Sequence, residues 1–134
     1  EQNMSFIRHV CEMFGWQRDF RLSSSYPSER KRSQRVLELL RACGATVYCS
    51  AHGSFGYMRD EGLFPADGVE VKFLKYAHTA YVQRLSEAFI PYLSVLDALF
   101  NVGAEATAGI IVNGTSWLNW DEMNKEDAGI THNE

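Results

Sequence analysis

Apolar side chains recur at helical spacing in two parts of the chain. The first set is Phe6, Ile7, Val10, Cys11, Met13 and Phe14. The second set is Val36, Leu37, Leu39, Leu40 and Cys43. These patterns predict one amphipathic helix over about residues 3–14 and another that starts near Ser28, where Ser28 or its neighbour can cap it. Gly15 and Gly44 follow the two patterns directly, and glycine is the residue that most often ends a helix.

Three short β-prone runs separate the helical patterns. Residues 19–22 alternate polar and apolar side chains, as do residues 69–76, which include Val69, Val71 and Phe73. Residues 46–49 follow a helix and a glycine, which is typical of a buried parallel strand. The sequence therefore predicts strands in these three places.

The second half of the chain has one strongly apolar helical pattern and a polar end. Pro91 precedes the apolar positions of this helix, which are Leu93, Val95, Leu96, Leu99 and Phe100. Gly103 interrupts the pattern, so we predict a separate second helix over about residues 104–112. Residues 124–134 are polar and are expected to form a disordered tail.

This order of elements predicts an α/β fold, with a mostly parallel sheet flanked by helices and a helical segment near the C-terminus. We expect residues 1–123 to form a single domain. Ligands of open α/β sheets bind beyond the carboxyl ends of the strands. The functional residues are therefore expected in three loops, over residues 23–28, 50–57 and 77–89.

Composition narrows the class of protein. The chain has 134 residues, a formal net charge of −4 and 46% hydrophobic residues. These values exclude an intrinsically disordered chain and a basic nucleic-acid coat protein. We find no run of about eighteen apolar residues and no export signal, so no role at a membrane is expected. The three cysteines are then expected to be reduced thiols of a cytoplasmic protein.

No cofactor or metal motif stands out. Residues 50–57 lack the lysine of a phosphate-binding loop and the spacing of a dinucleotide fingerprint. Cys49 and His52 have the separation of two zinc ligands, but no second close pair accompanies them. We therefore expect neither a cofactor nor a metal. Cys49 is either a nucleophile that works with His78 or, more simply, a buried structural cysteine.

The segment after the last predicted strand carries the first candidate site. It contains Tyr76, His78, Tyr81 and Gln83. Histidine titrates near neutral pH and suits general acid–base catalysis, and the tyrosines and the amide can orient a polar substrate. The alternative is a structural histidine that a neighbouring backbone carbonyl holds in place.

Asp97 is an acid inside an apolar helical pattern, where a charge needs a partner. It could orient His78, as a carboxylate orients the imidazole of a catalytic triad, or accept a substrate amine. The alternative is that Asp97 lies in the first turns of its helix, interacts with the helix dipole and binds an arginine.

A basic run opens the second helix, where it opposes the helix dipole. Arg30, Lys31 and Arg35 belong to this run. A bound phosphate or carboxylate would compensate their charge. The alternative is an ordinary solvated face.

Several segments resemble the WbqC-like protein family. Residues 89–103 are similar to its stretch "F-x-P-x-L-S-x-L-D-x-L-F-N-x-G", and residues 44–50 to its "G-A-T-x-Y-x-S-G". Tyr76, His78, Tyr81 and Gln83 match its "Y-x-H-x-x-Y-x-Q", and Tyr57 and the pair Ser24 and Ser25 fall at expected positions. The likeness spans about residues 5–105. Ala51 stands where the family often has glycine, and the family's opening segment is absent, which suggests the C-terminal part of a larger domain.

The resemblance implies a bacterial transferase of O-antigen (lipopolysaccharide) or related glycan biosynthesis. Such an enzyme would move an aminoacyl group such as glycine, or another acyl group, onto an amino sugar. His78 and Asp97 would be its catalytic residues. The substrates, an acyl donor and an amino sugar or nucleotide sugar, would contact Ser24, Ser25, Arg30, Lys31, Arg35, Ser50, Gly53, Tyr57, Tyr81 and Gln83. The alternative is a non-catalytic module that binds a sugar nucleotide or a partner enzyme.

Overall fold

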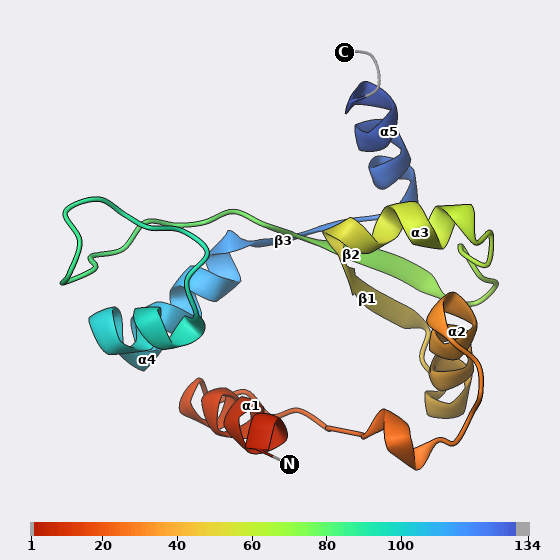
Figure 1. The fold of residues 1–134 in the computed structure, drawn as a ribbon, viewed down its shortest axis with the longest axis horizontal. Helices are drawn as coiled ribbons and strands as arrows, with labels where there is room; N and C mark the ends of the chain where they lie inside the picture. Colours follow the sequence, from red (N-terminus) through yellow and green to blue (C-terminus); the bar gives the residue numbers. More distant parts are fainter. Residues whose placement is uncertain (1, 131–134) are drawn as a thin grey trace. The chain divides into compact units, whose positions relative to one another are not determined.

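The computed structural model describes residues 2–130, and the contacts among them divide the chain into two compact units (Figure 1). The helical unit comprises the segment that ends at Phe20 together with Tyr76–Thr115. The sheet unit comprises Arg21–Lys75 and the segment that begins at Ser116. The single domain expected over residues 1–123 stays a prediction.

The described residues form five α-helices, two short 3-10 helices and three strands (Figure 1). The α-helices are α1 (Gln2–Met13), α2 (Arg32–Cys43), α3 (Phe55–Asp60), α4 (Val95–Gly114) and α5 (Trp120–Ile130). The strands are β1 (Val47–Ala51), β2 (Glu70–Tyr76) and β3 (Thr115–Leu118). The 3-10 helices are η1 (Ser23–Ser25) and η2 (His52–Ser54).

The strands form a small mixed sheet in the order β1-β2-β3. β1 and β2 are parallel, with Val47 opposite Glu70 and Ala51 opposite Leu74. The expected α/β class and the parallel pair are therefore confirmed. The expected mostly parallel sheet is confirmed only in part, because the sheet is small and mixed with one parallel pair, and the sequence did not indicate its third strand, β3.

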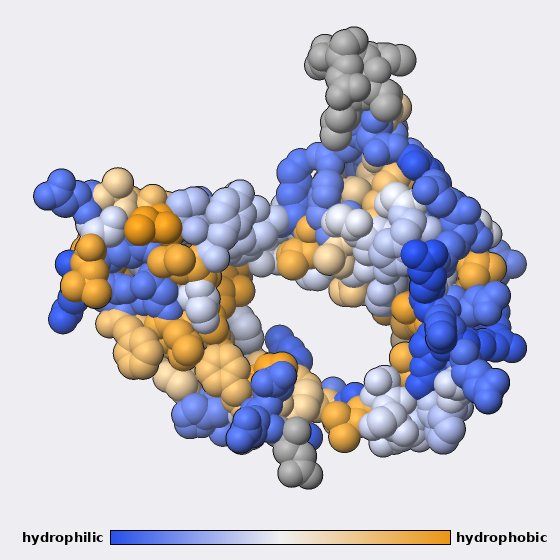
Figure 2. Space-filling model, viewed as in Figure 1, coloured by the Kyte–Doolittle hydropathy of each residue, from blue (hydrophilic) through white to orange (hydrophobic). Residues whose placement is uncertain are grey.

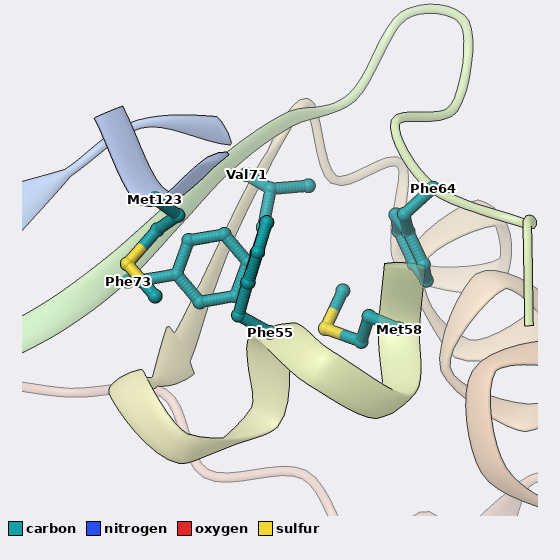
Figure 3. Close-up of a cluster of buried hydrophobic side chains, with 6 residues drawn as sticks. All are labelled: Phe55, Met58, Phe64, Val71, Phe73 and Met123. Carbon is teal, nitrogen blue, oxygen red and sulfur yellow. The ribbon is translucent and has the colours of Figure 1, made fainter. Parts of the chain in front are cut away.

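The apolar core of the sheet unit lies between α3, β2 and α5 (Figure 3). Its buried members are Phe55, Met58, Phe64, Val71, Phe73 and Met123. The ring of Phe73 meets Phe55 edge to face, with centroids 5.5 Å apart, and Trp120 packs on both rings. Alternation along β2 sends Val71 and Phe73 to this face, which is the pattern that predicted the strand.

Glycines end the helices where the sequence predicted. Gly44 follows α2 with a φ of 62°, and Gly15 follows α1 with a φ of 68°. Gly103 lies inside α4 with a φ of 82° and a ψ of 173°, so α4 is two helical segments joined at a kink. Left-handed and extended positive-φ conformations cost an L-residue far more than they cost glycine.

Two predictions about the first half of the chain are wrong. Residues 19–22 are not a strand, because four alternating residues gain nothing without a partner strand, and the described sheet does not include them. Ser28 does not cap α2. The residue that precedes this helix is Lys31, and the Ser28 hydroxyl accepts a hydrogen bond from the backbone N–H of Arg30 instead.

Two further segments are more ordered than expected. The loop predicted over residues 50–57 contains the end of β1, η2 and the start of α3. Phe55 and Met58 are three residues apart and both buried, a helical spacing that the nearby glycines obscured. The polar segment that begins at Asn124 is helical as far as Ile130, where α5 ends, so this part of the expected disordered tail is ordered. Residues 131–134 lie outside the described residues.

By length and composition, α4 is apolar enough to cross a membrane, which the search for long apolar runs did not indicate. Only 11% of its most apolar window is buried within the protein. The backbone leaves the helical conformation at Gly103, and Asp97 in the first turn is hydrogen-bonded to side chains of the segment before the helix.

Candidate functional site

Asp97 lies in the first turn of α4, in the helical unit. Ser94 precedes the helix, and its hydroxyl accepts a hydrogen bond from the backbone N–H of Leu96 at 3.3 Å. A serine at this position satisfies one of the free N–H groups of the helix start. The negative charge of Asp97 near these groups interacts favourably with the helix dipole. This part of the alternative interpretation of Asp97 is therefore confirmed.

The Asp97 carboxylate joins side chains from two segments. Oδ2 accepts hydrogen bonds from the Tyr81 hydroxyl at 2.7 Å and from Gln83 Nε2 at 3.0 Å. Oδ1 accepts one from Asn101 Nδ2 at 3.2 Å. The structure thus brings three of the candidate residues, Tyr81, Gln83 and Asp97, into one hydrogen-bonded group. We call these three residues and Asn101 the Asp97 network.

The Gln83 side chain also fixes the loop between β2 and α4. Its Oε1 accepts the backbone N–H of Ile90 at 2.8 Å, and its Nε2 donates to the Ile90 carbonyl at 3.0 Å. Gln83 is buried, so these bonds form away from water. Burial, and then the hydrogen bond to Asp97, raises the pKa of Tyr81, which keeps its hydroxyl protonated as a donor.

His78 lines a cavity of about 160 Å³ in the same unit. Its ring lies edge to face against Tyr76 and Tyr92, with centroids 5.0 Å and 4.2 Å away. Thr79, Ser94 and Thr107 add polar groups to the wall. The cavity therefore combines aromatic faces, hydroxyl groups and one imidazole.

Neither ring nitrogen of His78 makes a hydrogen bond to another described residue. The interpretation of His78 as a histidine held by a backbone carbonyl is therefore wrong. The expected contact between His78 and Asp97 does not form either, because Asp97 is engaged by Tyr81, Gln83 and Asn101. The imidazole nitrogens are left to solvent or a ligand.

The start of α2 already holds an anion, and it comes from the chain. The Glu61 carboxylate accepts the backbone N–H of Ser33 at 3.1 Å and pairs with Arg32 at 3.0 Å. Arg35 donates to the carbonyls of Ser23 and Tyr26 and pairs with Glu38. The compensation expected from a bound phosphate is thus provided by Glu61 at this helix start, and Arg35 is used within the unit.

The remaining basic and serine candidates lie in exposed parts of the sheet unit. Arg30 and Lys31 line an open hollow of about 610 Å³ before α2. Ser24 and Ser25 form η1 and are exposed. Neither serine of η1 lines this hollow.

The segment after β1 carries a group of hydroxyls. Ser50 Oγ lies 2.6 Å from Ser54 Oγ and donates to the Tyr48 hydroxyl at 3.2 Å. Tyr57, on α3, has a raised pKa because burial and then nearby Tyr48 disfavour its anion. Gly53 lies in η2. These residues belong to the sheet unit, and the His78 cavity is lined by the helical unit alone.

Cys49 is exposed on β1, so the expectation of a buried structural cysteine is wrong. A strand of a small sheet turns alternate side chains outward, and Cys49 takes an outward position between Tyr48 and Ser50. Cys49 belongs to the sheet unit and His78 to the helical unit, so the nucleophile–base pair of these two residues stays a prediction.

Two residues of the helical unit were missed by the sequence analysis. Asn101 follows Asp97 by four residues, the spacing at which helical side chains meet, so its role was open to prediction. Tyr92 packs on His78 with a φ of 64°, an uncommon conformation for a bulky residue. No local pattern signals that contact.

The geometry can be compared with known proteins. The model of the WbqC-like protein family matches residues 1–108, which include every residue of the Asp97 network and the greater part of the wall of the His78 cavity. An uncharacterized protein of Mycobacterium tuberculosis, Rv1507c, is 30% identical over 104 residues, which cover 78% of this chain and 45% of that protein. The chain therefore spans about half the length of this relative. No solved structure matches. With four fifths of its length matched by one family model, the chain belongs to the WbqC-like protein family.

Proposed function

We propose that the protein is an acyltransferase or aminoacyltransferase that acts on the amine of an amino sugar in the biosynthesis of O-antigen or a related glycan. The observation that carries the proposal is the His78 cavity. Aromatic faces bind sugar rings, hydroxyl groups bind sugar hydroxyls, and an imidazole with unpaired nitrogens can accept a proton. The cavity volume of about 160 Å³ is below the roughly 300–1,000 Å³ of sites for drug-sized ligands, which suits one small ring.

His78 would act as the general base of the reaction. The sugar amine attacks the acyl carbonyl, a C–N bond forms, and the bond between the acyl group and its carrier breaks. The proton that leaves the amine passes to His78 and then to the departing carrier group. A correctly placed general base contributes about 10²–10⁴-fold in rate.

Asp97 would act through other residues rather than on the substrate amine of this cavity. Its contacts to Tyr81 and Gln83 fix the loop that carries His78, so it is a positioning residue for the base. Ser50, Tyr57, Arg30 and Lys31 belong to the sheet unit, and their expected role in substrate binding stays a prediction.

The assay for the proposal is amide formation. The protein is incubated with glucosamine or UDP-glucosamine and with acetyl or glycyl thioesters, and N-acylated sugar is measured by mass spectrometry. His78→Ala should lower the rate about 10²-fold or more, which is the contribution of a general base. The matched control is His9→Ala, on exposed α1, which should leave the rate unchanged.

A second candidate, a non-catalytic sugar-binding module, is favoured by one observation. No carboxylate of the described residues is hydrogen-bonded to His78, although such a partner orients the histidine of hydrolytic triads. If no donor gives an amide while glucosamine binding is measurable and weakened by His78→Ala, the binding module is the function and the transferase proposal fails.

A further inference from the structure

A second cavity of the helical unit is lined in part by the Asp97 network and shares Ile90 and Leu93 with the wall of the His78 cavity. Its volume is about 490 Å³, and Asp97 and Gln83 form part of its wall. We call it the Asp97 groove. Its apolar wall consists of Leu85, Ile90, Leu93 and Phe100, and its remaining polar residues are Arg84, Ser86 and Asn101.

The apolar wall of the groove is unusually exposed. Leu85 is fully exposed, and Phe100 is 83% exposed. Ile90 and Leu93 are about half exposed. Hydrophobic side chains gather over α4 and the loop before it (Figure 2). Exposed apolar side chains that cluster around a few polar groups mark ligand-binding grooves more often than isolated ones do.

The Asp97 carboxylate lines this groove and has no ion-pair partner among the described residues. Its ion-pair partners would lie within 4 Å, and no described lysine, arginine or histidine does. A half-buried carboxylate is costly unless an opposite charge accompanies it, and the dipole of α4 offsets only part of that cost. Oδ1 accepts a single hydrogen bond, from Asn101, so it has room for another donor.

We infer that the Asp97 groove binds a primary ammonium group at Asp97 Oδ1, with the apolar substituent of the same ligand against Leu93 and Phe100. The ligand class is an α-amino acid or its activated acyl derivative with an apolar side chain. The inference rests on the proposed function only in making this ligand the acyl group that is transferred. The binding site follows from the charge of Asp97 and the apolar wall.

Arg84 distinguishes the two forms of the ligand. Arg84 lines the groove, and its side chain forms no ion pair with a described residue. A free amino acid has a carboxylate that Arg84 can bind, whereas an ester or thioester has none. The shared chemistry is the ammonium beside the apolar side chain.

Binding is measured by NMR titration with small probes and without any acceptor sugar. Leucine methyl ester should bind at least tenfold more tightly than N-acetylleucine methyl ester, which lacks the ammonium, and than glycine methyl ester, which lacks the side chain. Free leucine that binds as tightly as the ester, and loses tenfold in Arg84→Met, identifies the free amino acid as the ligand. Weaker binding of leucine than of its ester identifies the activated form.

Two variants test the two halves of the site. Asp97→Asn should abolish the preference for the ammonium probe, but it alters the Asp97 network and can impair folding. Phe100→Ser changes an exposed side chain. It should lower the affinity for leucine methyl ester tenfold and leave the affinity for glycine methyl ester unchanged. The matched control is Val112→Ser, also on α4 and 60% exposed but outside the groove, which should change neither.

Equal binding of the acetylated and free-amine probes would overturn the inference, and so would an unchanged affinity in Phe100→Ser. These results are independent of the proposed function. If the probes do not bind but amide still forms, only the ligand site in the Asp97 groove is rejected. If the probes bind but no amide forms, the transferase proposal is rejected.

Discussion

Phe73 in the sheet unit and Gln83 in the helical unit are both buried, but different forces hold their neighbours. Phe73 is 0% exposed and lies among aromatic and aliphatic side chains that burial alone brings together. Gln83 makes hydrogen bonds to Asp97 and to the backbone of Ile90. The buried residues of the helical unit include Thr107 and Ala98 besides Gln83, and no large apolar side chain of the described part of this unit is fully buried.

This difference explains where the candidate chemistry lies. Apolar burial is non-directional and gives the sheet unit stability, whereas a hydrogen-bonded network places particular atoms at particular distances. The helical unit uses such a network to hold the loop before α4, and it leaves large apolar side chains such as Leu85 and Phe100 exposed. A unit built in this way has surface to offer a ligand.

The largest expected effect tests the apolar half of the comparison. Phe73→Ala removes a fully buried ring, and it should lower the free energy of unfolding by about 3–5 kcal/mol. Phe100→Ala is the matched control, since the same change at an 83% exposed position should stay within about 0.5 kcal/mol. Urea denaturation followed by tryptophan fluorescence measures both. Equal losses would show that Phe100 is buried in solution and would break the comparison.

The next effect tests the polar half. Gln83→Ala leaves the N–H and carbonyl of Ile90 and one acceptor of Asp97 without their partner, which should cost about 1–3 kcal/mol. Native-state hydrogen exchange should show that the Ile90 amide loses protection while the amide of Phe73 in β2 keeps it. Val82→Ala, at the neighbouring and 76% exposed position, should change neither. Unchanged protection of Ile90 in Gln83→Ala would mean that the network does not hold the loop.

Much of the fold was predictable from local patterns. Gly15, Gly44 and Gly103 interrupt or end helices as expected, because a helical pattern and a positive φ are both local properties. The parallel pair of β1 and β2 followed from β-prone runs separated by a long connection. α3 was missed because two glycines masked a six-residue helix, whose stability comes from the burial of Phe55 and Met58 rather than from its propensity.

The sequence indicated which residues belong to the candidate site better than it indicated which of them contact one another. An acid in an apolar helical pattern marked Asp97, and the clustering of His78, Tyr81 and Gln83 marked the loop before it. Which of them would meet Asp97 depended on the irregular path of residues 77–94, and no periodicity describes such a path. The hydrogen bonds to Asp97 that we predicted for His78 are therefore made by Tyr81 and Gln83.

The smallest expected effect concerns a polar network on the surface of the sheet unit. Glu126 on α5 accepts hydrogen bonds from Lys75 and from His52, the latter at 2.9 Å. Lys75 first, and then His52, lowers the pKa of Glu126 below its ordinary value. The three side chains are between one third and about half exposed, so we expect their contribution to be smaller than that of the buried Gln83.

The sign of the pH dependence follows from that lowered pKa. In the window between the ordinary pKa of glutamate, about 4.3, and the lower folded value, the unfolded chain binds more protons than the folded one. The contribution of Glu126 is therefore fully present above this window and is lost as the pH falls through it. Glu126→Gln should lower the free energy of unfolding at pH 7, and its stability should converge with that of the unsubstituted protein as the pH falls below this window, as measured by urea denaturation at decreasing pH. Glu105→Gln, an exposed change on α4, should run parallel to the unsubstituted protein throughout. A Glu126→Gln curve that also stays parallel would show that surface contacts of this kind do not stabilise the sheet unit and that its stability comes from the apolar core alone.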